Sequence, residues 1–256
     1  MGQFKSVITL LVSVLIFSGV IWGVHTATQS RFFALNMIEV SDNRHDLSIQ
    51  PPLSGVEIEK LIRSGNKGKT LFQIKLNSIE SRLNQFEWIQ KVELQKVFPQ
   101  TLAASIRFRL PIALVRIGGK VQYLDETGTL FGEFKRARGA SFPLIEMVER
   151  SLSKEECLEI VAFLRDWKES GLSESLALEN LEWSQKEGIR AVATYKISQR
   201  KQRALIRLGQ NFGEVFLPRA LKLKRVVDYA IRHAKRVREF FVADSQKIVV
   251  KTDLGS

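Results

Sequence analysis

The chain has 256 residues, which is enough for two modest folded domains with separate hydrophobic cores. Hydrophobic residues make up 45% of the composition and charged residues 26%, which excludes a chain that is disordered over most of its length. The net charge is +12; because residues 1–32 hold two basic residues and no acidic one, the remainder carries +10 and must meet anionic surroundings or serve solubility.

The first predicted element is an apolar helix at residues 7–24 that anchors the chain in a membrane. These 18 residues carry no charge and would form about 27 Å of helix, close to the roughly 30 Å hydrocarbon core of a bilayer. A cleavable signal peptide is the competing interpretation, but its apolar region is shorter and ends in small residues, whereas Trp22 and His25 stand here. We expect an uncleaved anchor behind a cytoplasmic tail of residues 1–6.

A strand is predicted at residues 34–40, and two short helices follow it. Ser54 with Glu57 has the spacing of a capping box, in which each residue bonds the other's backbone N–H at the start of a helix. Asn77 with Glu80 repeats that spacing, so we expect a second helix to begin there.

From residue 91 the apolar residues recur every second position, which predicts a strand up to residue 97. A turn at residues 98–101 then leads into a return strand at residues 102–108. The predicted unit therefore runs strand, helix, helix, strand, strand.

The region after residue 110 is predicted to be a second, β-rich domain with two helices and a final strand. Gly118–Gly119 between alternating runs indicates a hairpin turn. Cys157 shares an apolar helix face with Val161 and Leu164, so we interpret it as a buried structural thiol. The expected elements are strands at 111–117, 120–124 and 129–131, a helix at 153–169, a hairpin at 189–197 and 203–208, a helix at 218–239 and a strand at 247–252.

Five successive motifs in this order resemble the FtsQ/DivIB family of bacterial cell-division proteins. They are TLFQI at 70–74, EWIQKV at 87–92, KVFPQTL at 96–102, RLPIA at 109–113 and LDETGTLF at 124–131. Their order and spacing match across about 60 residues, and one N-terminal anchor and IRLG at 206–209 add to the resemblance. The signature positions, to which we assign a structural role, are Trp88, Phe98, Pro99, Leu102, Arg109 and Pro111.

The resemblance implies an α+β protein with one transmembrane helix at 7–24, a POTRA domain (β-α-α-β-β) at 33–110 and an FtsQ-type β domain at 111–252. It implies a non-enzymatic scaffold of the division septum that recruits FtsB/FtsL-like membrane proteins and, through them, septal peptidoglycan synthases of the FtsW/FtsI kind. The expected location is the inner, cytoplasmic membrane at the division site, with the C-terminal domains on the periplasmic or extracytoplasmic side.

The sequence offers no catalytic constellation of its own: no nucleophile with a base, paired carboxylates or phosphate-binding glycine loop comes together. We therefore expect no enzyme activity, no cofactor, no metal and no small-molecule substrate. A membrane-anchored POTRA protein acting in protein transport or envelope assembly is the alternative function, and an anchored envelope enzyme is a third class that lacks its nucleophile. Nucleic acid is not an expected partner, because aromatic residues do not alternate with the basic ones.

Two candidate interaction sites remain. The basic helix at 218–239 presents Arg232, Lys235 and Arg236, which are interpreted either as a solvated face or as a site for an acidic partner or anionic envelope polymer. The last strand, preceded by a short apolar run, is interpreted either as core or as a sheet edge that accepts a partner's strand. The residues expected there are Phe240, Phe241, Val242, Ile248, Val249 and Val250.

Overall fold

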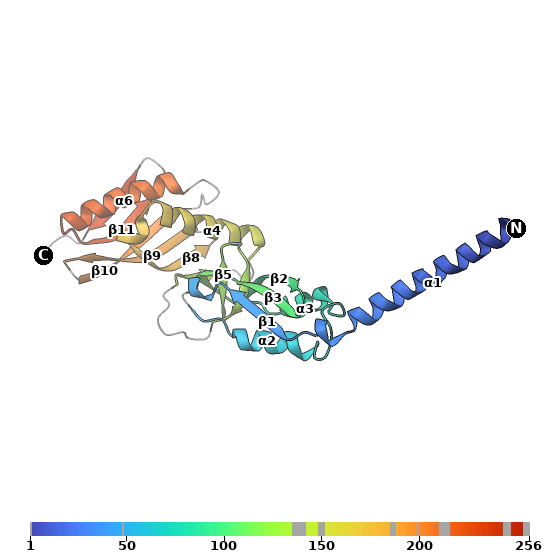
Figure 1. The fold of residues 1–256 in the computed structure, drawn as a ribbon. Coiled ribbons are helices and arrows are strands. Elements are labelled where there is room, and N and C mark those ends of the chain that lie inside the picture. Colours follow the sequence, from blue (N-terminus) through green and yellow to red (C-terminus); the bar gives the residue numbers. More distant parts are fainter. Residues whose placement is uncertain are drawn as a thin grey trace. The chain divides into compact units, whose positions relative to one another are not determined.

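The computed structural model describes residues 2–47, 49–134, 142–147, 152–184, 188–198, 200–209, 216–242 and 247–252 (Figure 1). The chain divides into two compact units. Unit 1 consists of residues 1–46 and 50–109, and unit 2 of residues 47–49 and 110–256.

Unit 1 begins with α1 (Gly2–Thr28), a helix that is longer than the predicted 7–24 anchor. Its stretch Leu10–Thr28 has a mean hydropathy of 1.9, and in the described part of the chain this is the one helix long and apolar enough to cross a membrane. Its apolar side chains are exposed all round, as Leu15 at 75% and Phe17 at 71% illustrate. A helix that is apolar on every side needs a nonaqueous environment, which fits a single-pass membrane protein.

The rest of unit 1 confirms the predicted order of strand, helix, helix, strand, strand. Two short 3-10 turns, η1 (Arg31–Phe33) and η2 (Arg44–Asp46), flank the first strand. The strands form a three-stranded sheet in the order β1-β3-β2, with β1 parallel and β2 antiparallel to β3. The elements are β1 (Met37–Asp42), α2 (Gly55–Ser64), α3 (Leu76–Leu83), β2 (Ile89–Val97) and β3 (Thr101–Phe108).

The return strand β3 supplies the inner face of this sheet. Its alternate residues Leu102, Ala104, Ile106 and Phe108 are each at most 2% exposed. The buried residues of the two helices that complete this core are Ile58 and Ile62 of α2 and Ile79 and Leu83 of α3. The period of two in the sequence therefore predicted the buried face correctly.

The helix starts of unit 1 divide into one confirmed and one wrong prediction. At α2 the capping box forms, with the Glu57 amide donating to Ser54 Oγ at 3.2 Å and the Ser54 amide donating to Glu57 Oε2 at 2.6 Å. That backbone hydrogen bond from Ser54 holds the pKa of Glu57 below its ordinary value. At α3 the helix already begins at Leu76, so Asn77 lies inside the first turn and the N-cap, Lys75, makes no side-chain hydrogen bond.

Unit 2 is built on a nine-stranded sheet in the order β12-β11-β10-β9-β8-β7-β4-β5-β6. Its helices α4 and α6 lie side by side over this sheet (Figure 1). The strands are β4 (Pro111–Ile117), β5 (Lys120–Asp125), β6 (Leu130–Glu133), β7 (Leu144–Met147), β8 (Ala177–Ser184), β9 (Gly188–Ile197), β10 (Arg200–Gly209), β11 (Val237–Val242) and β12 (Ile248–Thr252). The helices are α4 (Lys154–Glu169), the one-turn α5 (Leu172–Ser175) and α6 (Leu217–Arg232).

Two local predictions for unit 2 are confirmed, the hairpin turn at Gly118–Gly119 and the buried thiol of Cys157. Gly118 and Gly119 turn the β4–β5 hairpin with φ of 56° and 85°, values that glycine adopts without strain. The Asp125 carboxylate accepts hydrogen bonds from the amides of Thr127 and Thr129, at 2.9 and 2.8 Å, which makes it a turn former. Cys157 is a free, buried thiol, and burial raises its pKa.

The predicted helix at 218–239 is wrong in its last third. The helix α6 ends at Arg232, and after a turn in which Ala234 has φ 47° the chain continues as strand β11, parallel to β10. The reason is burial on the sheet, because Val237 and Phe240 belong to the core and are 3% and 0% exposed. Tertiary packing overrides the helical spacing of the apolar residues here.

Candidate functional site

Strand β12 lies at one edge of the nine-stranded sheet. It pairs antiparallel with β11, with Phe241 opposite Val249 and Val242 opposite Ile248. Among the described residues, no strand lies on its outer side. An edge of this kind presents unpaired N–H and C=O groups, and the backbone of another extended chain can bond to them.

The six residues predicted for this site divide between the two faces of the sheet. Phe240 and Val242 are fully buried and belong to the core, which fits the core interpretation for these two residues. Ile248 and Val250 are partly buried and pack against the same core.

The opposite face carries the residues that remain accessible. Val249 is 49% exposed, and its register partner Phe241 is half-buried. The guanidinium of Arg207, from the adjoining position on β10, lies 5.2 Å from the Phe241 ring centre. Arg207 also forms an ion pair with Glu239. Arg207, Phe241 and Val249 therefore form a row across the last three strands, which we call the edge row.

The three predicted basic residues do not form one helix face. Arg232 is the last residue of α6, whereas Lys235 and Arg236 lie in the turn before β11. All three are exposed. The Arg232 Nε donates to the Asp228 carbonyl oxygen at 3.3 Å, and the Lys235 ammonium lies 5.2 Å from the ring centre of Tyr229.

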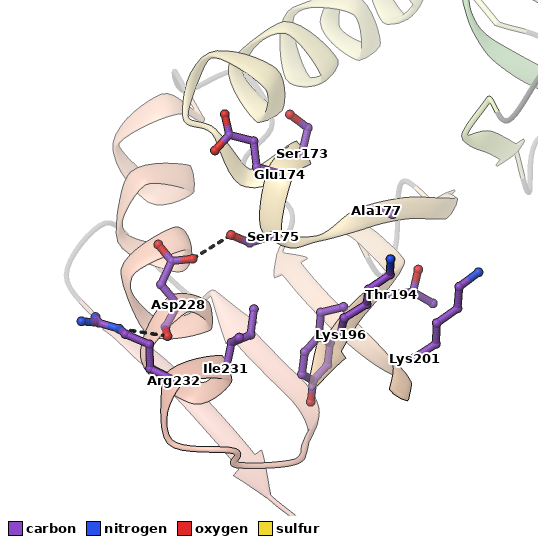
Figure 2. A pocket seen from close by; sticks show the side chains of 11 residues that line it. Ser173, Glu174, Ser175, Ala177, Thr194, Lys196, Lys201, Asp228, Ile231 and Arg232 are labelled. Carbon is purple, nitrogen blue, oxygen red and sulfur yellow. Dashed lines mark hydrogen bonds between the residues drawn. The ribbon is translucent and has the colours of Figure 1, made fainter. Parts of the chain in front are cut away.

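A pocket that the sequence did not predict, lined mostly by residues with polar side chains, lies beside Arg232 (Figure 2). It has a volume of about 930 Å³ and is formed by α5, α6, the start of β8 and the β9–β10 hairpin. Figure 2 shows Asp228 directed toward Ser175, with Lys196 and Lys201 on the hairpin side. The lining residues are Ser173, Glu174, Ser175, Ala177, Thr194, Tyr195, Lys196, Lys201, Asp228, Ile231 and Arg232.

Two side-chain hydrogen bonds hold the Asp228 carboxylate of this pocket. The Ser175 hydroxyl donates to Asp228 Oδ1 at 2.7 Å, and the Lys224 ammonium donates to Oδ2 at 2.7 Å. Partial burial pushes the pKa of Asp228 upward, but these hydrogen bonds and the charges of Lys224 and Arg232 outweigh it, so the pKa lies below its ordinary value. A carboxylate held ionised in this way is too weak a base to activate the serine.

The motif residues of unit 1 have mostly structural positions. Leu102 is fully buried, and Pro111, the first residue of β4 in unit 2, is buried as well. The Arg109 amide donates to the Trp88 carbonyl oxygen at 2.9 Å, which ties the end of β3 to the start of β2. Phe98 is different, because its ring is 51% exposed, and Pro99 beside it is also exposed.

No metal-binding cluster is found where the structure can be described: within those ranges, His, Cys, Asp and Glu side chains do not gather in threes.

Comparison with known proteins gives a consistent result. Residues 53–107 match the family described as POTRA domain, FtsQ-type. The cell division protein FtsQ of Geotalea daltonii is 28% identical over 153 residues, which cover 56% of this chain and 52% of the relative. The FtsQ proteins of Koribacter versatilis and Myxococcus fulvus are 23% and 26% identical, over 81% and 62% of this chain and 59% and 55% of their own lengths. The chain thus spans about half the length of these curated relatives.

Proposed function

We propose that the chain is a member of the FtsQ/DivIB family and a non-enzymatic scaffold of the cell-division machinery, held in the cytoplasmic membrane by α1. The observation that carries this proposal is the outer edge of β12, which is open in the described chain at the end of a nine-stranded sheet. A scaffold needs surfaces that bind other chains, and an open edge supplies both backbone hydrogen bonds and side-chain contacts.

The proposed partners are membrane proteins of the FtsB/FtsL kind, and through them septal synthases of the FtsW/FtsI kind. A partner segment adds to β12 as a further strand, and its side chains alternate between the two faces. On the accessible face they lie directly beside Val249, and Phe241 follows one strand further in, at about 10 Å from the added strand. Units 1 and 2 are proposed to lie on the periplasmic side at the division site.

The basic residues Arg232, Lys235 and Arg236 are proposed to attract an acidic part of the same partner. They are exposed and belong to the helix end and turn that precede β11. Opposite charges at the rim of an interface accelerate association more than they tighten the complex.

Charge reversal at the three positions should therefore slow association and weaken its salt dependence, as surface plasmon resonance can measure. Reversal of Lys120, Arg165 and Lys168, which changes the net charge equally, is the matched control; equal effects from both sets contradict the proposal.

The test of the edge uses Val249→Pro in the full chain, with Val249→Thr as the matched control. Proline cannot donate a backbone hydrogen bond and disturbs the edge, whereas threonine keeps the amide and the branched shape. We expect Val249→Pro to lose the FtsB-like partner in a pull-down while its thermal unfolding stays cooperative, and Val249→Thr to bind as the wild type does.

A second variant, Val249→Glu, places a charge on the accessible face and keeps the test decisive should the proline variant unfold. Binding at wild-type strength by a folded Val249→Pro or Val249→Glu variant contradicts the role of the edge.

The cellular role is tested by depletion. We expect cells that lack the chain to form filaments without septa, and a fluorescent fusion to gather at the division site. Normal division, together with a uniform distribution around the envelope, would contradict a division role and favour a transport or assembly function.

A further inference from the structure

Unit 1 carries a cluster of phenylalanine rings on its surface. Phe33 is in contact with Phe32, Phe72 and Phe98, with ring centres 5.1, 5.0 and 6.1 Å apart, and Phe72 lies 5.0 Å from Phe98. Phe33 is partly buried, but Phe32, Phe72 and Phe98 are 61%, 46% and 51% exposed. We call these four residues the aromatic cluster. So much exposed aromatic surface in one place marks a contact site.

Backbone hydrogen bonds tie this cluster to the segment that follows α1. The Leu71 amide donates to the Phe33 carbonyl oxygen at 2.8 Å, and the Gln100 side-chain amide donates to the Phe32 carbonyl oxygen at 3.1 Å. Ala34 forms a bridge with Thr70. The loops that bear Phe72 and Phe98 are therefore held beside the first residues that leave the helix.

Chain length fixes how far the cluster can lie from the membrane. Three residues lie between Thr28, the last residue of α1, and Phe32, so four Cα–Cα steps put their Cα atoms at most about 14 Å apart. The polar interface of a bilayer adds about 5 to 8 Å on each side of its hydrocarbon core. The cluster can thus reach the headgroup layer, and aromatic rings are favoured at that depth.

The segments that bear the cluster carry charges of a single sign. The three segments that form it, residues 29–37, 65–76 and 94–102, contain no aspartate or glutamate. Their basic residues are Arg31, Lys67, Lys69, Lys75 and Lys96. Exposed apolar rings surrounded by lysine and arginine have the chemistry that binds an anionic lipid surface, in which the rings enter the interface and the cations meet the phosphates.

We propose that the aromatic cluster and its basic surround dock unit 1 on anionic phospholipid headgroups at the end of α1. The docking gives unit 1 a second attachment to the membrane besides the helix itself. It requires that α1 spans the bilayer, and it is independent of the partner that binds β12.

The experiment places a tryptophan in the cluster and asks whether lipid quenches it. The full chain is reconstituted in bilayers of phosphatidylethanolamine and phosphatidylglycerol that contain lipids brominated near the top of the acyl chain. Trp22→Phe removes the tryptophan of the membrane helix, and Phe98→Trp adds one to the cluster. We expect a loss of the added emission, and no such loss when bromine is absent.

Val56→Trp in the same background is the matched control. Val56 is 61% exposed on α2, and its neighbour Gly55 lies next to Arg44. Arg44 follows the last residue of β1, whereas Phe33 precedes the first, so Val56 and Phe33 belong to opposite ends of this strand. Six residues of strand, about 20 Å, separate these two ends. Emission of this variant should not change. Phe72→Trp repeats the test at a second cluster position in case Phe98→Trp disturbs folding.

Two further measurements show whether anionic lipids or a protein bind the aromatic cluster: a change of lipid composition and a photocrosslink at position 98. Replacing phosphatidylglycerol by phosphatidylcholine should reduce the quenching at Phe98→Trp, and Lys69→Gln with Lys96→Gln should do the same. Equal quenching in both lipids contradicts the role of anionic headgroups. If the tryptophans placed in the cluster stay unquenched, the docking is contradicted altogether. In that case, a photocrosslinker at position 98 that captures a protein in cells would assign the surface to a protein partner.

Discussion

Asp228 of α6 connects this helix to α5 through its side chain. It receives hydrogen bonds from Ser175 of α5 and Lys224 of α6, and its backbone carbonyl receives one from Arg232. The net effect is a lowered pKa in the folded protein. A lowered carboxyl pKa stabilises the fold above the unfolded pKa, 3.8, and this stabilisation is lost as the pH falls through the folded value.

We therefore predict that Asp228→Asn lowers the free energy of unfolding by about 1 kcal/mol at pH 7, because a partly exposed charged hydrogen bond is weakened by solvent. The difference from the wild type should shrink as the pH falls below the unfolded pKa. Urea unfolding between pH 7 and pH 3 measures it, with Glu174→Gln as a neighbouring control that should change little. A gap of constant size across this range contradicts the assignment.

At the scale of elements, the sequence predicted local structure correctly where the backbone conformation requires a particular residue type. The Gly118–Gly119 turn and the capping box of α2 belong to this class. The Asn77–Glu80 spacing failed because a cap requires the helix to begin next to it, and packing moved the beginning of α3 to Leu76. The spacing of the residues shows which side chain could cap a helix, but the packing of the core determines the residue at which the helix begins.

This contrast gives a paired prediction. Ser54→Ala removes a real cap and should lower the free energy of unfolding by about 1 kcal/mol. Asn77→Ala should change it by less than about 0.5 kcal/mol, because the side chain caps nothing and alanine favours helix. Chemical denaturation of the two variants measures both values. Equal losses would show that the sequence had identified the second cap correctly after all.

The candidate site was predictable to the extent that it lies on consecutive residues. The final strand, predicted at residues 247–252, is found at Ile248–Thr252, but the division between buried Phe240 and half-buried Phe241 depends on which face α6 covers. The pocket beside Asp228 was not predictable, since three stretches far apart in sequence contribute its lining: α5 with the start of β8, the β9–β10 hairpin, and α6. The end of α6 was missed because the apolar residues of β11 continue the helical spacing by coincidence.

For the whole molecule, the division into an apolar helix and two compact units determines how the chain should behave on fractionation. We predict that it stays in the membrane fraction through washes with high salt and alkaline carbonate, and that detergent releases it. A purely electrostatic attachment would be screened by the salt. Mass spectrometry of the released chain should find residues 1–28. A shortened chain in the soluble fraction would favour cleavage of the segment.

The parallel pairing of β1 with β3 has a mechanical consequence. The chain enters the sheet of unit 1 at Met37, the start of β1, and leaves it after Phe108, the end of β3, while six residue pairs join these strands. Tension between the anchor and unit 2 would load the ladder in shear, so that its hydrogen bonds resist together instead of opening one by one. The hypothesis is that unit 1 acts as a force-bearing clamp. Single-molecule pulling between residues 30 and 110 should give a higher rupture force than pulling between positions 37 and 101, where the same bonds unzip in turn.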